Sequence, residues 1–96
     1  MDDKDVYLVK DLFESAFLYA SNAKLINFKK DGSYYWLVFK DRSLCENLIQ
    51  RYWGREASID PKSFADALRS LKDRLFVLMK RDEYGKNKTM ENRGLH

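Results

Sequence analysis

Two segments rich in apolar and aromatic residues between Ala23 and Lys40 form the clearest structural pattern in the chain. The segments, AKLINFKK and SYYWLVFK, are typical of β-strands and lie on either side of Asp31-Gly32. Asp-Gly between two such segments is a preferred two-residue hairpin turn. The pattern therefore predicts a β-hairpin in which Lys30 lies opposite Ser33.

The turn also predicts which side chains share each face of the hairpin, because successive strand residues point to opposite faces. One face is wholly apolar near the turn and is expected to belong to the core. Its pairs are Phe28 with Tyr35 and Ile26 with Leu37, and Phe39 lies further along. The other face is mixed, and its pairs are Lys29 with Tyr34, Asn27 with Trp36, and Leu25 with Val38.

The rest of the chain predicts two short strands and three helices. VYLV at residues 6–9 is typical of a strand, and ASI at 57–59 is long enough only for a brief edge strand. Apolar residues at helical spacing, with capping residues before them, predict the helices. They are expected from Asp11 to Ser21, from Asp41 or Ser43 to Gly54, and from Asp60 to Gly85.

The first six predicted elements follow the ferredoxin-like βαββαβ order. We therefore predict an α+β fold: a small antiparallel sheet with helices in the ferredoxin-like order, followed by a long C-terminal helix. At 96 residues the chain is expected to form a single domain over residues 1–85. Residues 86–96 are polar and without periodicity, which predicts a disordered basic tail.

Three stretches resemble a family of short prokaryotic and phage-borne domains whose function is unknown (a domain of unknown function). They are YLVKDLFESAFLYAS, the hairpin ending in WLVFKD, and RYWGREASIDPKSFADALRSLKDRLF, and together they lie within residues 6–76. The resemblance implies a small cytoplasmic accessory protein of the kind often borne by phages and mobile elements. It implies no activity and no catalytic residue.

The composition indicates the cell compartment in which the protein is expected. The single cysteine, Cys45, cannot form an internal disulfide, which suits a reducing cytosol. No apolar run approaches the ~20 residues that a membrane span needs, and the acidic start MDDKD does not resemble a signal peptide. We therefore predict a soluble, cytoplasmic protein without membrane contact.

Residues suited to catalysis or metal binding are scarce. The only histidine is His96, at the end of the chain, and one Cys with one His excludes the usual structural zinc patterns. Asp60-Pro61-Lys62 is similar to the acidic-x-lysine fragment of metal-dependent nucleases, but helix capping explains Asp60 fully. We predict a protein that is not an enzyme, with no catalytic residues, no metal and no cofactor.

The mixed face of the hairpin is the first candidate binding site. Aromatic side chains beside Lys on an open sheet can stack the bases of single-stranded nucleic acid, and the net charge of +3 is compatible with a polyanion. The alternative is that the third helix covers Tyr34 and Trp36, since strand aromatics are usually core. The candidate residues are Tyr34 and Trp36 for stacking, Lys29, Lys24 and Lys40 for phosphates, and Asn27 for a base edge.

The third helix is the second candidate site. LFVLM at residues 75–79 is apolar all round, so it must be buried on more than one side, either within the domain or against a partner. That partner could be a second copy across a two-fold axis, or a host protein on which a phage-type regulator docks. The alternative is an ordinary core helix. The candidate interface residues are Leu71, Leu75, Phe76, Leu78 and Met79.

Overall fold

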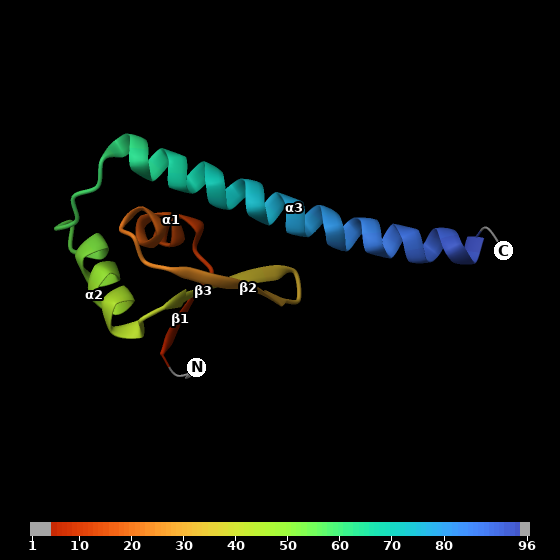
Figure 1. Cartoon of the computed structure of the whole chain (residues 1–96), viewed down its shortest axis with the longest axis horizontal. Helices are drawn as coiled ribbons and strands as arrows, with labels where there is room; N and C mark the ends of the chain where they lie inside the picture. Colours follow the sequence, from red (N-terminus) through yellow and green to blue (C-terminus); the bar gives the residue numbers. More distant parts are fainter. Residues whose placement is uncertain (1–4, 95–96) are drawn as a thin grey trace.

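A computed structural model describes the backbone of residues 5–94 and the side chains of residues 5–82. These residues form a three-stranded antiparallel sheet and three helices, so the predicted α+β class is confirmed (Figure 1). The elements are β1 (Val6–Val9), α1 (Leu12–Ala20), β2 (Leu25–Asp31), β3 (Tyr34–Lys40), α2 (Arg42–Trp53) and α3 (Pro61–Gly94).

The sheet has the strand order β1-β3-β2, and β3 pairs antiparallel with both neighbours. The prediction of a strand at residues 57–59 is wrong, because this segment belongs to the loop between α2 and α3. Ala57 and Ile59 are half-buried there and line a pocket with Phe17 and Phe64, rather than extending the sheet. Without this strand, the ferredoxin-like order is not confirmed.

The hairpin turn consists of Gly32 and Ser33, one residue later than predicted, because Asp31 pairs with Tyr34. Gly32 has a φ of 63° and Ser33 is not among the residues with positive φ, as in a type II′ turn with glycine first. The register is therefore wrong by two residues, and Phe28 lies opposite Leu37 rather than Tyr35. A shift of two keeps every side chain of β3 on its predicted face.

A bulge interrupts β2 between Leu25 and Asn27. The predicted pair of Leu25 with Val38 on the mixed face is wrong, because Leu25 lies opposite Phe39 and packs against the core. Ile26 was expected on the core face opposite Leu37, but its side chain is 43% exposed. The extra residue of a bulge is not paired with the neighbouring strand. The bulge therefore explains why Ile26 departs from the predicted alternation.

Each helix begins at an aspartate whose carboxylate accepts a hydrogen bond from a backbone N–H of the first turn. Asp11 accepts from Glu14 at 2.9 Å, Asp41 accepts from Leu44 at 3.2 Å, and Asp60 accepts from Ser63 at 3.0 Å. Such caps satisfy donors that have no partner within the helix. The three predicted helix starts are confirmed, with Asp41 rather than Ser43 as the second cap.

Helix α3 includes Gly85, so the predicted end of the helix at this residue is wrong. Of the predicted tail at 86–96, residues 86–94 are helical and the last two lie outside the described residues. One glycine inside a helix costs only about 1 kcal/mol relative to alanine, which favourable neighbours can offset. The helix extends well beyond the sheet, and the molecule measures 59 × 33 × 18 Å (Figure 1).

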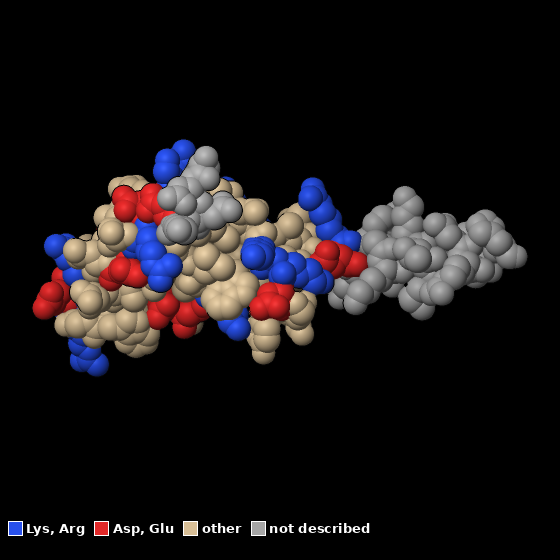
Figure 2. All heavy atoms as spheres, turned by 90° about the horizontal axis from the view of Figure 1, so that it is seen from below, with Lys and Arg blue, Asp and Glu red and all other residues tan. Residues whose placement is uncertain are grey.

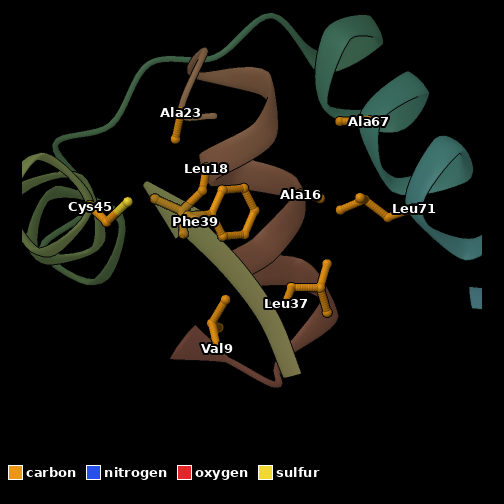
Figure 3. Close-up of a cluster of buried hydrophobic side chains, with 9 residues drawn as sticks. All are labelled: Val9, Ala16, Leu18, Ala23, Leu37, Phe39, Cys45, Ala67 and Leu71. Atoms are coloured by element: carbon orange, nitrogen blue, oxygen red, sulfur yellow. The ribbon is translucent and has the colours of Figure 1, made fainter. Parts of the chain in front are cut away.

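The core lies between one face of the sheet and helices α1 and α3. Phe39 and Leu37 of β3 meet Leu18 of α1 and Leu71 of α3, and all four side chains are at most 1% exposed (Figure 3). Helix α2 adds Cys45 to the same cluster. Helix α3 therefore packs on the same side of the sheet as α1, which answers the question that the sequence left open.

Candidate functional site

The face of the sheet that points away from the core carries the even-numbered residues of β3. Tyr34 is 63% exposed, whereas Trp36 and Val38 are half-buried. Leu8 of β1 pairs with Val38 and is 39% exposed. Among the described residues, α1 and α3 both lie on the opposite side, so we call this surface the open sheet face.

Lys10 joins the two aromatic side chains of the open sheet face. Its Nζ atom lies 4.6 Å from the ring centroid of Tyr34 and 4.7 Å from that of Trp36. An ammonium at this distance is attracted to both rings, by about 0.5–1 kcal/mol at an exposed site. Trp36 is held from another direction, because its Nε1 donates a hydrogen bond to Asp31 Oδ2 at 3.1 Å. The pair is thus positioned before any ligand arrives.

The sequence analysis missed Lys10, although it named six other residues for this surface. Lys10 follows Leu8 by two positions, so the period of a strand places both residues on one face. The period alone does not show that β1 lies beside β3, with Leu8 opposite Val38. Only that pairing brings Lys10 to the aromatic side chains.

Further polar residues surround the aromatic pair. Lys29 lies opposite Trp36 and Asn27 lies opposite Val38, so both share the open sheet face as predicted. Lys40 lies opposite Val6 on the same face, four residues from Trp36 and therefore ~13 Å away along the strand. Lys24 precedes β2, and its carbonyl accepts a hydrogen bond from the N–H of Lys40 at 2.9 Å.

Two of these groups already have partners within the chain. The side-chain oxygen of Asn27 accepts a hydrogen bond from the N–H of Phe28 at 2.8 Å, which engages one of its two lone pairs. Asp31 accepts from Trp36 and is the acidic residue of this cluster. Figure 2 views the molecule from the side opposite α3, and there Lys and Arg lie interspersed with Asp and Glu.

Comparisons with protein-family models, with curated proteins and with solved structures found no match. The resemblance of residues 6–76 to a family of short prokaryotic and phage-borne domains therefore stays a prediction. The described residues contain no group of three or more His, Cys, Asp or Glu that could hold a metal ion. In the same part of the chain, no helix combines the length and the apolar composition that crossing a membrane requires.

The candidate interface residues of α3 are divided between the core and the surface. Leu71 is fully buried, so it is not available to a partner in this fold. Leu75 and Leu78 are half-buried, whereas Phe76 is 62% and Met79 is 54% exposed. The exposed side chains of this segment thus point to solvent rather than deep into the domain.

A polar contact fixes α3 over the hairpin. The Tyr35 hydroxyl donates a hydrogen bond to Asp82 Oδ2, and Lys30 Nζ lies 3.0 Å from the same oxygen. Tyr35 and Lys30 are paired residues on the covered side of β3 and β2. The hydrogen bond to Asp82 raises the pKa of Tyr35, because the carboxylate favours the protonated phenol.

A tryptophan at the end of a helix, such as Trp53 at the end of α2, usually seals the edge of the core. Its side chain is instead 65% exposed, and its Nε1 donates to Glu14 Oε2 at 2.8 Å. Its ring lies edge-on to Tyr52 with the centroids 5.3 Å apart. Trp53 therefore ties α2 to α1 at the surface and is not a core residue.

Proposed function

We propose that this protein is a small non-enzymatic binding protein that holds single-stranded nucleic acid on the open sheet face. The proposal is carried by one observation: Tyr34 and Trp36 lie side by side, uncovered by α1 or α3, with the ammonium group of Lys10 over both rings. A soluble domain usually covers such a pair with its own helix. Bases supply the same cover when they stack.

Stacking gives the affinity without requiring a particular sequence. Each base that stacks on an aromatic side chain contributes ~1–3 kcal/mol, and all four bases have the flat π face that this needs. Two rings at neighbouring positions of one face can accept two bases. A base that approaches Tyr34 or Trp36 displaces the Lys10 ammonium from the ring, and the freed cation can then contact a phosphate.

Lys29 and Lys40 extend the cationic surface along the sheet on either side of the aromatic pair. Each lysine that neutralises a phosphate lowers log K by ~0.7 per decade of salt on a single strand. With Lys10, Lys29 and Lys40 engaged, the slope is about −2. Affinity is then expected to fall about 20-fold between 50 and 200 mM salt.

Fluorescence anisotropy of a labelled single-stranded oligonucleotide tests this proposal directly. Tyr34→Ala and Trp36→Ala are each expected to weaken binding at 50 mM salt by at least tenfold. Phe76→Ala is the matched control, because it removes an equally exposed aromatic ring from α3, remote from the open sheet face. Lys10→Ala is expected to reduce the salt slope by ~0.7. Lys72→Ala is its charge-matched control and is expected to leave the slope unchanged.

Two results would reject the open sheet face as a nucleic-acid site. One is the absence of any retention of the oligonucleotide at 50 mM salt by a folded protein. The other is binding that Phe76→Ala weakens as much as Trp36→Ala does, since the oligonucleotide would then bind non-specifically to exposed aromatic residues.

A second candidate function is supported by the exposed side chains of α3. Phe76, Val77 and Met79 are each more than half exposed on adjacent positions of one helical turn. We propose as the alternative that α3 pairs with a second copy of the chain or docks on a host protein. Sedimentation at high protein concentration is expected to show a dimer that Phe76→Glu converts to a monomer, whereas a wild-type monomer under these conditions excludes self-association.

We also propose, from the resemblance of residues 6–76, that the protein is a cytoplasmic accessory factor borne by a phage or another mobile element. A small domain that coats or marks single-stranded nucleic acid fits such a role. Localisation of a tagged protein in its own host would test the compartment.

A further inference from the structure

A pocket lies among the three helices, on the side of the sheet away from the open sheet face. It has a volume of about 360 Å³ and is bounded by Phe17 of α1, Tyr52 of α2, the loop before α3, and Phe64 of α3. In Figure 1 this loop rises at the left edge of the molecule, from the end of α2 to the start of α3. The volume falls within the range of ~300–1,000 Å³ of small-ligand pockets.

The lining of this pocket is apolar except for one cation. Phe17 is almost fully buried and its ring centroid lies 5.2 Å from that of Tyr52, so the two rings form a firm wall. Ile59, Pro61 and Phe64 line the remainder, and Arg55 supplies the positive charge. An apolar cavity with one charged side chain is the usual composition of a site that orients a small ligand.

Arg55 occupies a backbone position that normally favours glycine. Its φ is 61°, and it follows the end of α2 in a Schellman arrangement. The N–H of Glu56 donates to the carbonyl of Arg51 at 2.9 Å, and the N–H of Arg55 donates to that of Tyr52 at 3.3 Å. The left-handed residue of this motif is usually glycine, because a Cβ atom is strained there.

The other non-glycine residues with positive φ are Asn22 and Asp41. Short polar side chains of this kind can compensate for the strain by local hydrogen bonds, and Asp41 does so as the cap of α2. Arg55 has no such side-chain hydrogen bond among the described residues, and the two Schellman hydrogen bonds hold its backbone in the left-handed conformation. A residue that is held in a strained conformation is a candidate functional position.

The guanidinium group of Arg55 makes no ion pair and no hydrogen bond with the described residues. Two carboxylates of the elements around the pocket are engaged elsewhere, since Glu14 of α1 accepts from Trp53 Nε1 and Asp60, the cap of α3, accepts from both the N–H and the Oγ of Ser63. A guanidinium is suited to a carboxylate, which it binds through two parallel hydrogen bonds. The pocket thus offers an open apolar depression beside a guanidinium group that has no partner among the described residues.

We infer that this pocket binds a carboxylate with an apolar body, in which the ring or alkyl chain packs between Phe17, Tyr52 and Phe64 while the carboxylate pairs with Arg55. This chemistry is shared by small aromatic or aliphatic acids and by a peptide that ends in an apolar residue with a free carboxyl group. The site is independent of the open sheet face.

Phenylacetate and its neutral isostere phenylacetamide are the first probes. In a Trp36→Phe variant, Trp53 is the sole tryptophan and lies in edge-on contact with Tyr52 of the pocket wall, so its emission reports occupancy. Saturable binding of phenylacetate at millimolar concentration, at least tenfold tighter than that of phenylacetamide, is the expected result. Equal binding of acid and amide, or no saturation by either probe or by the peptides below, would overturn the inference.

Arg55→Gly is the decisive variant, because glycine is the residue that this backbone position favours. The variant is expected to unfold at a higher urea concentration than the parent and yet to lose at least tenfold in affinity for phenylacetate. Arg69→Ala, which removes the same charge from the exposed surface of α3, is the matched control and is expected to bind as the parent does. Unchanged binding by Arg55→Gly would overturn the inference.

A tetrapeptide ending in phenylalanine distinguishes the two sources of the carboxylate. If the peptide with a free carboxyl group binds at least tenfold more tightly than phenylacetate, and the amidated peptide does not, the site recognises a chain terminus. If the free peptide does not bind and phenylacetate does, the ligand is a small acid. Loss of oligonucleotide binding would leave both results unaffected, so the two proposals can fail separately.

Discussion

The two faces of the sheet are made by alternate residues of one strand and yet have different environments. On one face, Leu37 and Phe39 are at most 1% exposed. On the other, Tyr34 is 63% exposed, and Trp36 and Val38 are only half-buried. Both sets are apolar or aromatic, so the composition of β3 does not explain the difference. The burial of each face is decided by where the helices pack.

Small residues allow α3 to pack closely against α1, on the same face of the sheet. Ala16 of α1 and Ala67 of α3 are both buried in the same cluster, and small side chains let two helices approach closely. Leu71 then reaches the core beside Leu37 (Figure 3). Further along, Asp82 of α3 contacts Tyr35 and Lys30 on the covered face. These contacts hold α1 and α3 on the covered face, so neither of these two helices lies over the open sheet face.

Truncation of one aromatic residue on each face is the strongest test of this difference in burial. Phe39→Ala is expected to lower the free energy of unfolding by ~3–5 kcal/mol, because it leaves a cavity in the core. Tyr34→Ala is expected to change it by less than about 0.5 kcal/mol, as at most surface sites. Urea unfolding at one fixed protein concentration measures both. A loss above about 2 kcal/mol for Tyr34→Ala would mean that this face is covered in solution.

Trp36 is an intermediate case, because it lies on the open sheet face and is nevertheless half-buried, with the Lys10 ammonium over its ring. Trp36→Ala is expected to lower the free energy of unfolding by ~1–2 kcal/mol, well below the ~3–5 kcal/mol of a Trp in a closed core. Part of that loss is the interaction with Lys10, which a double-mutant cycle with Lys10→Ala isolates. We expect a coupling of ~0.5–1 kcal/mol. Strict additivity of the two variants would show that the ammonium does not stabilise the ring.

The sequence predicts the faces well because their assignment depends only on the two-residue period of a strand. A turn displaced by one residue moved the register by two, so Leu37 and Trp36 kept their predicted faces. The aspartate caps were predictable for the same reason, since Asp11 and Asp60 act on a backbone N–H only three residues away. Local rules suffice where the partner is local.

The sequence does not predict features that depend on distant partners. Lys10 reaches the aromatic pair only because β1 lies next to β3, and no local pattern encodes that pairing. The side of the sheet that α3 covers depends on the packing of α3 against α1, whose buried residues Ala67 and Ala16 are 51 positions apart in the sequence. Arg55 was also missed, since a left-handed residue at the end of a helix is expected to be glycine.

Alkaline pH tests the covered side of the molecule, because the buried thiol of Cys45 belongs to it. Burial, and to a lesser extent the negative charges of Asp41, Asp5 and Glu46, raise the pKa of Cys45 from 9.0 to about 11. A pKa that is higher in the folded state stabilises the fold fully below pH 9, and this contribution is lost as the pH rises towards 11. At pH 10 the loss is expected to be about 1 kcal/mol.

Cys45→Ala removes this titration, so its free energy of unfolding is expected to fall less steeply than that of the wild type between pH 8 and 10. The comparison uses the slopes, because the variant also loses packing at every pH. Urea unfolding under reducing conditions measures both curves, and Tyr34→Ala on the open sheet face serves as the control with the wild-type slope. Identical slopes for Cys45→Ala and the wild type would show that the thiol is solvated in solution. The part of the core at α2 would then be more open to water than the part at α1.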